Sequence, residues 1–175
     1  MKPGDSSSLC LECGLCCNGV IFANGQLQPE DDIGLLRSLG LKLGRNPKSE
    51  IRNPKFEQPC ACLDGRTCQI YSDRPKYCRE FECLLLKSVK VGRTDTAAAL
   101  RTIRNARQRV QKVKRLLRHL GNTEENLALS KRFRKVMRRV ESTTLDDDTS
   151  KKFGELTLAV HDLNVLLSEA FYSAP

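Results

Sequence analysis

Nine cysteines, gathered in two short stretches, are the residues of this sequence that could do chemistry. A cysteine thiolate is the soft ligand that zinc and iron–sulfur clusters use. The C-x-x-C spacing lets two sulfurs from one tight turn reach the same ion. We therefore expect the two stretches to close on each other around metal. The first stretch holds Cys10, Cys13, Cys16 and Cys17, and the second holds Cys60, Cys62, Cys68, Cys78 and Cys83.

The first stretch contains a glycine and an adjacent pair of cysteines. Gly14 lies where a turn that brings sulfurs together often needs a positive φ. Adjacent side chains on an extended backbone point in opposite directions, so Cys16 and Cys17 should serve different ions or different edges of one cluster. The bacterial ferredoxin pattern C-x2-C-x2-C-x3-C-P is not met, because the fourth cysteine is misplaced.

A disulfide framework is the alternative for so many cysteines in a chain of 175 residues. The cysteine count is odd, the spacing is that of metal sites, and residues 1–8 have no apolar signal-peptide core. These features favour a reducing compartment, and we expect a cytoplasmic protein. No apolar run approaches the roughly 20 residues of a membrane span, so no membrane role is expected.

Four cysteine-bearing segments combine into a specific pattern. They are the C-x-x-C-x-x-C-C run at residues 10–17, Pro59-Cys60-Ala61-Cys62-Leu63-Asp64-Gly65, Cys68-Gln69-Ile70-Tyr71-Ser72-Asp73-Arg74-Pro75 and Cys78-Arg79-Glu80-Phe81-Glu82-Cys83. This pattern resembles the signature of the CxxCxxCC, or YkgJ-like, family of cysteine-cluster proteins. The resemblance covers roughly residues 10–84, which is about half of the chain.

The resemblance implies a chain that chelates zinc or iron, the latter including an iron–sulfur cluster, through eight cysteines. They would fill two four-cysteine sites, or ligate one cluster with the remaining thiols structural. Cys62 stands where the family has an apolar or aromatic residue, so we interpret it as a small buried hydrophobe. Ala61 and Glu82 replace family prolines, and neither change removes a ligand. The expected ligands are Cys10, Cys13, Cys16, Cys17, Cys60, Cys68, Cys78 and Cys83.

Four other residues of the second stretch have an expected place near the thiols. Arg74 and Arg79 are either surface residues or donors of hydrogen bonds to thiolates, which would offset the charge of an all-thiolate site. Tyr71 and Phe81 are expected to pack over the site and keep water out.

The distribution of charge divides the chain near residue 90. Residues 1–90 carry 13 Lys and Arg against 11 Asp and Glu, a net charge of +2, whereas residues 91–175 carry 17 against 10, a net charge of +7. We expect a disordered tail at 1–9, a cysteine-cluster metal-binding domain at 10–90 and a basic helical extension at 91–175. Because aromatic residues are few and Trp is absent, metal should contribute much of the folding energy of the cysteine domain.

Local signals predict short elements in the cysteine domain. A β-branched run at residues 19–23 predicts a strand that ends at the Asn24-Gly25 turn signal. Pro and acidic residues at 28–32 predict the start of a helix that ends at Gly40 or Gly44. Residues 44–59 are expected to form a loop.

Apolar residues at spacings of three and four predict three helices in the basic half. The first helix begins near Thr94 and stops at Gly121-Asn122, the second begins at Thr123-Glu124-Glu125, and the third is capped by Asp148 or Thr149. The predicted fold is therefore α-rich with minor β: a small irregular cysteine-rich metal-binding domain followed by a three-helix antiparallel bundle. His119 and His161 fall on these helices and are expected at the surface rather than as ligands.

Residues 101–139 carry a dense positive charge, with 14 Lys and Arg against Glu124 and Glu125. Such a surface can neutralise nucleic-acid phosphates or meet an acidic protein, and a solvated helix face is the remaining alternative. Besides the metal ion, nucleic acid and an acidic protein are therefore the expected partners.

We interpret the whole chain as a metal-binding module rather than an enzyme. The alternative is an accessory or catalytic subunit of a metallocluster enzyme of the flagellin lysine methylase type, because a cluster resembling this one is fused to such a protein in some members of the family. This chain lacks their long additional region and any glycine fingerprint for S-adenosylmethionine.

Overall fold

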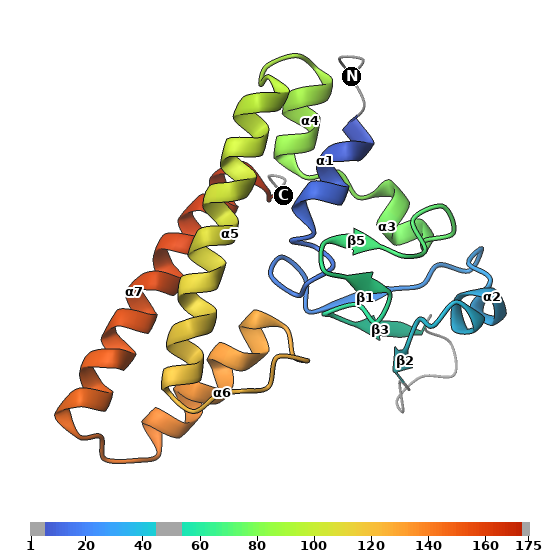
Figure 1. Ribbon diagram of the computed structural model, residues 1–175. Helices are drawn as coiled ribbons and strands as arrows, with labels where there is room; N and C mark the ends of the chain where they lie inside the picture. Colours follow the sequence, from blue (N-terminus) through green and yellow to red (C-terminus); the bar gives the residue numbers. More distant parts are fainter. Residues whose placement is uncertain (1–5, 45–53, 173–175) are drawn as a thin grey trace.

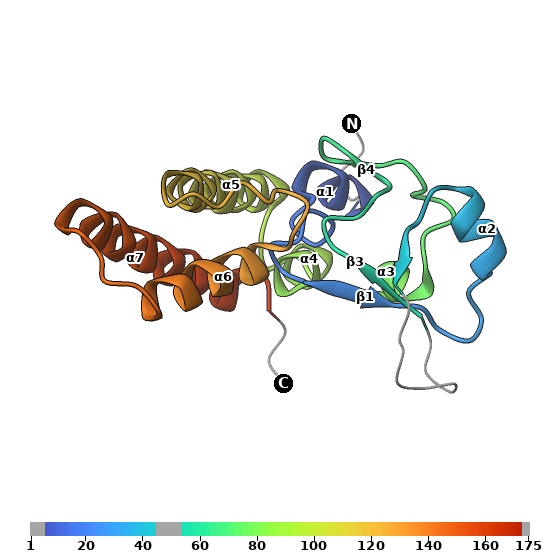
Figure 2. The same ribbon diagram turned by 90° about the horizontal axis from the view of Figure 1, so that it is seen from below.

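The computed structural model describes residues 6–44 and 54–172, and it shows an α-rich chain with a few short strands (Figure 1). Two long helices form an arm on one side, and the strands gather on the other side (Figures 1 and 2). The α-rich class predicted from the sequence is thus confirmed. Within the described residues, no helix is both long enough and apolar enough to cross a membrane.

The chain begins with α1 (Ser6–Cys13), which carries the first two cysteines. Its first residues belong to the segment expected as a tail, and residues 1–5 lie outside the described part. Gly14 ends the helix with φ +66°, a value that glycine adopts without strain. The backbone N–H of Gly14 donates to the carbonyl of Cys10 over 3.1 Å. The positive φ predicted at Gly14 is therefore confirmed.

A three-stranded antiparallel sheet follows, in the order β1-β3-β2. Its strands are β1 (Asn24–Gln26), β2 (Leu43–Gly44) and β3 (Lys55–Glu57). The strand predicted at residues 19–23 is wrong, because that segment forms turns and bends and β1 begins at Asn24. Gly19 has φ +78°, and a Cβ there would lie 2.9 Å from the Cα of Ala128, so the chain turns sharply against the later helices. The predicted loop over 44–59 contains β3, and residues 45–53 lie outside the described part.

Between β1 and β2 the chain forms α2 (Ile33–Ser38), close to the predicted position. Asp32 caps it, accepting a 2.9 Å hydrogen bond from the N–H of Leu35, and Gly40 follows its end with φ +94°. A small apolar cluster, the strand core, lies between α2 and the sheet. Its buried members are Leu27, Leu36, Leu41, Phe56, Cys62 and Ile70.

The second cysteine stretch is built from four short elements. The hairpin β4 (Leu63–Asp64) and β5 (Thr67–Cys68) turns at Gly65, which has φ +56°. It is followed by α3 (Lys76–Glu80) and α4 (Leu84–Lys90). Each element carries or borders one cysteine, so the backbone here mainly serves to place thiols.

The basic half consists of α5 (Thr96–His119), α6 (Leu129–Glu141) and α7 (Asp147–Ala170). α5 and α7 run antiparallel and pack along each other (Figures 1 and 2). The apolar stripe predicted for α5 is buried, for example at Ile103, Val110 and Leu117. The buried stripes of the long helices, together with Leu9, Leu15, Val20, Leu85 and Leu86 of the cysteine half, form a second and larger apolar cluster, the helical core.

Two predicted helix starts in this half are wrong. α6 begins at Leu129 rather than at Thr123, because the intervening loop is fixed by a buried arginine. Arg132 Nε donates to Asn122 Oδ1 over 2.8 Å, and its Nη2 donates to the Asn122 carbonyl over 3.0 Å. The cap of α7 is Asp146, not Asp148 or Thr149, and its carboxylate accepts from the N–H of Thr149. The antiparallel bundle of three helices stays a prediction, since the long packing contact is that of α5 with α7.

Candidate metal centre

The first two cysteines lie three residues apart in α1, so their side chains share one face of the helix. After Gly14 the chain turns, with the N–H of Asn18 donating to the Gly14 carbonyl over 2.9 Å. Cys16 and Cys17 lie in this turn. The first C-x-x-C pair, Cys10 and Cys13, therefore lies in the last turn of a helix.

The second stretch returns to the first through the backbone. The N–H of Cys60 donates to the carbonyl of Cys17 over 2.7 Å, which fixes the two stretches together. Cys68 lies in β5, Cys78 in α3, and Cys83 caps the N-terminus of α4. Residues that are far apart in the sequence are thereby placed in one region of the molecule.

Backbone N–H groups point at several sulfurs. Cys83 Sγ accepts from the N–H of Leu86 over 3.5 Å. The N–H of Leu15 donates to the Cys13 sulfur and the N–H of Cys62 to the Cys60 sulfur, and each bond lowers the pKa of the thiol that receives it. Hydrogen bonds of this kind favour the thiolate, which is the form that binds metal.

Burial acts in the opposite direction and is the largest influence on these thiols. It raises the pKa of Cys13, Cys17 and Cys78 to about 12 and that of Cys60 to about 11, and it raises the pKa of Cys16 well above its ordinary value. Repulsion between neighbouring thiolates adds to the rise. Without a cation the buried sulfurs therefore hold their protons, and a bound metal would reverse this preference.

The electrostatic neighbours of each thiol separate the eight expected ligands into two sets. Cys16 interacts with Cys13, Cys10 and Cys83, whereas Cys17 interacts with Cys78, Cys68 and Cys60. The two sets meet at the adjacent pair Cys16-Cys17, and Cys17 also interacts with Cys10. The first set is Cys10, Cys13, Cys16 and Cys83, and the second set is Cys17, Cys60, Cys68 and Cys78.

Packing separates five of the eight thiols in the same way. Cys13 and Cys83 of the first set pack against the helical core. Cys60, Cys68 and Cys78 of the second set pack against the strand core. These five thiols therefore lie against two different apolar cores.

The donor types fit a thiophilic metal, but the side chains do not yet form a coordination sphere. Among the residues that the structure describes, no three His, Cys, Asp or Glu side chains converge closely enough to hold an ion. A cysteine sulfur moves by rotation about χ1 without a change in the backbone. The identity of the eight ligands stays a prediction.

The ninth thiol has a different environment. Cys62 is a buried member of the strand core, and its Sγ donates to the Leu39 carbonyl over 3.6 Å. This burial agrees with the interpretation of Cys62 as a small hydrophobe, although its side chain also contacts Cys60.

Arg74 is the cation that faces both sets. Burial raises the pKa of Cys10 and Cys78, and the positive charge of Arg74 opposes that rise in each case. Its guanidinium lies 3.8 Å from the centroid of the Tyr71 ring, and Arg79 Nη1 donates to the Arg74 carbonyl over 2.9 Å. Arg74 Nε is buried without a hydrogen-bond partner among the described residues. Of the two arginines considered from the sequence, Arg74 is the one whose charge acts on the thiols of both sets, and its donation to a thiolate stays a prediction.

An aromatic group beside the thiols was missed in the sequence. Phe22 packs edge-to-face against Phe81, with ring centroids 4.8 Å apart, and against Tyr77 at 5.7 Å. Burial raises the pKa of Tyr77, and the thiolates of Cys78 and Cys16 add to the rise, so Tyr77 lies near both sets. The sequence predicted a strand at Phe22, and only the three-dimensional contact with Phe81 shows that it belongs to this aromatic group.

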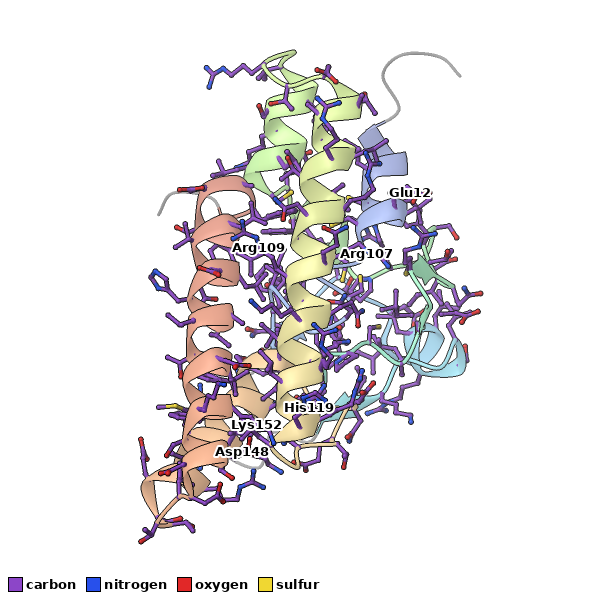
Figure 3. The ribbon with its side chains drawn as sticks, turned by 60° about the vertical axis from the view of Figure 1, so that its left-hand side comes forward. Glu12, Arg107, Arg109, His119, Asp148 and Lys152 are labelled. Carbon is purple, nitrogen blue, oxygen red and sulfur yellow. The ribbon has the colours of Figure 1, made fainter. Side chains whose placement is uncertain are left out.

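The two histidines lie on the long helices, outside both cysteine stretches. His119 lies in the last turn of α5, at the end of that helix distant from α1 (Figure 3). His119 and His161 are both exposed on helix surfaces.

Comparison with known proteins identifies the family. The sequence model of the CxxCxxCC family, described as a putative zinc- or iron-chelating domain, matches residues 9–115. The match extends beyond the cysteines into α5, further than the resemblance at residues 10–84. No curated protein and no solved structure matches the chain significantly. With most of its length matched and both cysteine stretches included, the chain belongs to the CxxCxxCC family of zinc- or iron-chelating domains.

Proposed function

We propose that this protein binds zinc or iron through two sets of four cysteine thiolates. The first set is Cys10, Cys13, Cys16 and Cys83, and the second is Cys17, Cys60, Cys68 and Cys78. The observation that carries the proposal is that Cys16 and Cys17 have different thiols as neighbours, and the packing of five other thiols against two separate cores agrees with it. Four thiolates are the usual ligand set of a structural zinc ion and of an iron–sulfur cluster.

The surrounding residues support metal binding in three ways. Backbone N–H groups at Cys13, Cys60 and Cys83 stabilise negative charge on sulfur. Arg74 supplies a positive charge between the sets, and its free Nε offers one further donor. Bound metal would contribute the folding energy that the small strand core does not supply.

Metal analysis after anaerobic purification tests the proposal. A colourless protein with about two equivalents of zinc is expected for two structural sites, and broad visible absorption with bound iron is expected for clusters. A protein that is purified without metal and does not take up zinc or iron when reconstituted would contradict the proposal.

Single substitutions test the division into sets. Cys83→Ser and Cys78→Ser should each lose about one metal site, and the double variant should lose both. Cys62→Ser is the matched control and should keep the full metal content, because Cys62 is proposed as a core residue. Equal metal loss from Cys62→Ser would show that the ligand set is wrong.

The basic residues 101–139 are proposed as the contact for a second partner, nucleic acid or an acidic protein. Their positive charge is the support for this proposal.

A further inference from the structure

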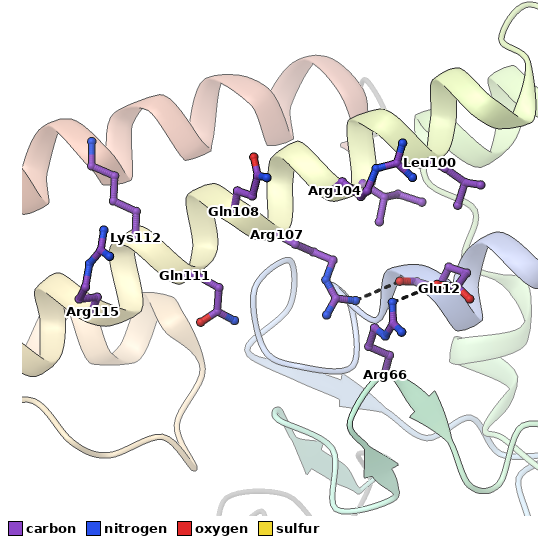
Figure 4. A pocket seen from close by; sticks show the side chains of 10 residues that line it. Glu12, Arg66, Leu100, Arg104, Arg107, Gln108, Gln111, Lys112 and Arg115 are labelled. Atoms are coloured by element: carbon purple, nitrogen blue, oxygen red, sulfur yellow. Dashed lines mark hydrogen bonds and ion pairs between the residues drawn. The ribbon is translucent and has the colours of Figure 1, made fainter.

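An open groove of about 560 Å³ lies between α5 and the cysteine half of the molecule (Figure 4). α5 forms one side, and α1 with the β4–β5 turn forms the other. Five cations and one acid line it: Arg66, Arg104, Arg107, Lys112, Arg115 and Glu12. The lining therefore carries a strong excess of positive charge.

The acid of the groove is already neutralised. Glu12 Oε2 lies 3.0 Å from Nη1 of Arg66, and Arg107 Nη1 donates to the Glu12 carbonyl over 3.1 Å. Figure 4 shows both guanidinium groups directed toward Glu12. Arg104, Lys112 and Arg115 are exposed and make no ion pair or hydrogen bond within the described residues. These three cations remain available to a ligand.

Several other cations of the basic region are paired with protein groups. Arg118 Nε lies 2.7 Å from Glu125 Oε1, and Lys135 Nζ lies 2.6 Å from Glu124 Oε1. The two acids of residues 101–139 are thus paired with cations that lie outside the groove. Arg134 and Arg138 of α6 are exposed like the groove cations, but they line a different cavity.

We propose that this groove binds the phosphodiester backbone of a single-stranded nucleic acid. The proposal deepens and rests on the partner role of residues 101–139 given above, and it does not depend on which metal is bound. From Arg104 to Arg115 the helix rises by roughly 16 Å, so the free cations follow an extended line rather than a point. A polymer with regularly repeated charge matches such a line.

The groove favours a strand over a duplex. A helix reads duplex DNA by entering the major groove, and this requires an unobstructed convex face. The basic face of α5 is instead walled by Glu12 of α1 and Arg66 of the β4–β5 turn (Figure 4). A single strand can lie in the groove, whereas a duplex would meet the opposite wall first.

The lining also favours nucleic acid over an acidic protein. Protein interfaces depend on apolar or aromatic anchors that fill pockets. Leu100 and Ile103 are the apolar residues of the groove, and Ile103 is already buried in the helical core. Gln108 and Gln111 add amide donors that suit phosphate and sugar oxygens. No aromatic side chain lines the groove, so bases would not be held by stacking, and contacts to phosphate alone are expected to be independent of base sequence.

Fluorescence anisotropy with a labelled 12-nucleotide oligouridine tests this proposal on the metal-loaded full chain. With three to four phosphates neutralised, the logarithm of the affinity should fall with the logarithm of salt with a slope of roughly −2 to −3. The double variant Arg104→Ala/Arg115→Ala should lose about tenfold in affinity and reduce the steepness of that slope by roughly 1.4. Arg134→Ala/Arg138→Ala removes the same charge outside the groove and should change the affinity by less than about threefold.

Three results would overturn the proposal. Equal losses in the two double variants would show that net charge alone attracts the strand. A duplex that binds as tightly as the strand and with the same dependence on Arg104 would exclude a strand-specific groove. Displacement of the oligouridine by an equal charge of polyglutamate would indicate an acidic protein partner instead. Metal content measured on the same samples separates these outcomes from failure of the metal sites, because the arginine variants should keep their metal.

Discussion

The two apolar cores of this molecule differ in size, although each forms a wall for cysteine thiols. Within the described residues the helical core contains twenty buried side chains and the strand core contains six. A cluster of six side chains is too small to stabilise a fold by burial alone. The helical core has the size of an ordinary small domain. We therefore expect bound metal to be necessary for the stability of the strand core and to add to the stability of the helical core.

The two halves of the chain share apolar packing, because residues of α1 and α4 belong to the helical core, and backbone hydrogen bonds add to that contact. The N–H of Leu129 donates to the Gly19 carbonyl over 2.9 Å, and the N–H of Leu84 donates to the Phe171 carbonyl over 3.3 Å. The end of α7 therefore lies against the segment that follows Cys83. Loss of the strand core should leave these helical contacts in place.

Removal of metal should produce the largest difference between the two cores. With a strong chelator the backbone amides of β3, such as Phe56, should exchange hydrogen as in an unfolded chain, because the strand core loses its main source of stability. The amides of α5 near Val110 should stay protected. Hydrogen exchange followed by mass spectrometry measures both regions in one experiment. Simultaneous loss of protection in β3 and α5 would show that the two cores unfold as one unit.

The helical core was largely predictable from the sequence, and the strand core was not. The spacing of Ile103, Val110 and Leu117 predicts α5 because a helical stripe is a local pattern. The pairing of Gly25 with Phe56 joins residues 31 positions apart, and no local pattern contains that information. The strand predicted at residues 19–23 failed for this reason, since its β-branched residues turn toward the helices instead.

The meeting of the two cysteine stretches could be predicted from the sequence, whereas the neighbours of each thiol could not, and the eight ligands stay a prediction. The sequence indicates which thiols gather, and the adjacent Cys16-Cys17 pair indicates that they diverge. The assignment of Cys83 to the first set depends on α4 packing beside α1, which is a tertiary contact. The position of Arg74 likewise depends on the fold, which brings both Cys10 and Cys78 close enough to feel the charge of this one side chain.

Replacement of the buried arginine should weaken the helical core strongly. Arg132 is 1 % exposed and makes two hydrogen bonds to Asn122 that fix the loop before α6. Arg132→Ala should lower the free energy of unfolding of this core by about 3 kcal/mol, because hydrogen bonds from a charged group are lost and two oxygens of the buried Asn122 lose their donor. Urea denaturation followed by circular dichroism at 222 nm measures the change.

The exposed Arg134 of the same helix is the control for that experiment. Arg134→Ala removes the same charge without a buried contact and should change the stability by less than about 0.5 kcal/mol. A similar loss in both variants would mean that charge, not the bonds to Asn122, determines the effect.

Two glycine substitutions should affect the cores in opposite directions. A Cβ at Gly25 would lie 2.2 Å from the Phe56 ring, which is buried and cannot move aside. Gly25→Ala should therefore destabilise the strand core by about 1–3 kcal/mol. Gly154 is exposed within α7 with nothing near its Cβ position, so Gly154→Ala should stabilise the helical core by up to about 1 kcal/mol.

Thermal unfolding of the metal-loaded variants, observed by hydrogen exchange in each core, separates these two effects. The change from Gly25→Ala should be confined to the strands, and the change from Gly154→Ala should be confined to α5 and α7. A change in both cores from either variant would require stronger coupling between them than the hydrogen bonds at Gly19 and Phe171 provide.

The smallest expected effect concerns the cap of α7 and its dependence on pH. The N–H and the hydroxyl of Thr149 donate to the Asp146 carboxylate and lower its pKa. A lowered pKa in the folded state means that this stabilisation is present above the unfolded value of about 3.9 and is lost as pH falls through the folded value. The wild-type helical core should therefore weaken slightly below about pH 4. Asp146→Asn keeps a good cap without a titrating group and should remove this part of the pH dependence, whereas Asp146→Ala should lower the thermal midpoint at every pH. Because Asp146 caps the start of α7, at the end of the helical arm away from the strands (Figure 1), the hydrogen exchange of β3 should be the same in all three proteins at pH 6. A change in the exchange of β3 would mean that the stability of α7 is transmitted to the cysteine half through Phe171, at the other end of this helix.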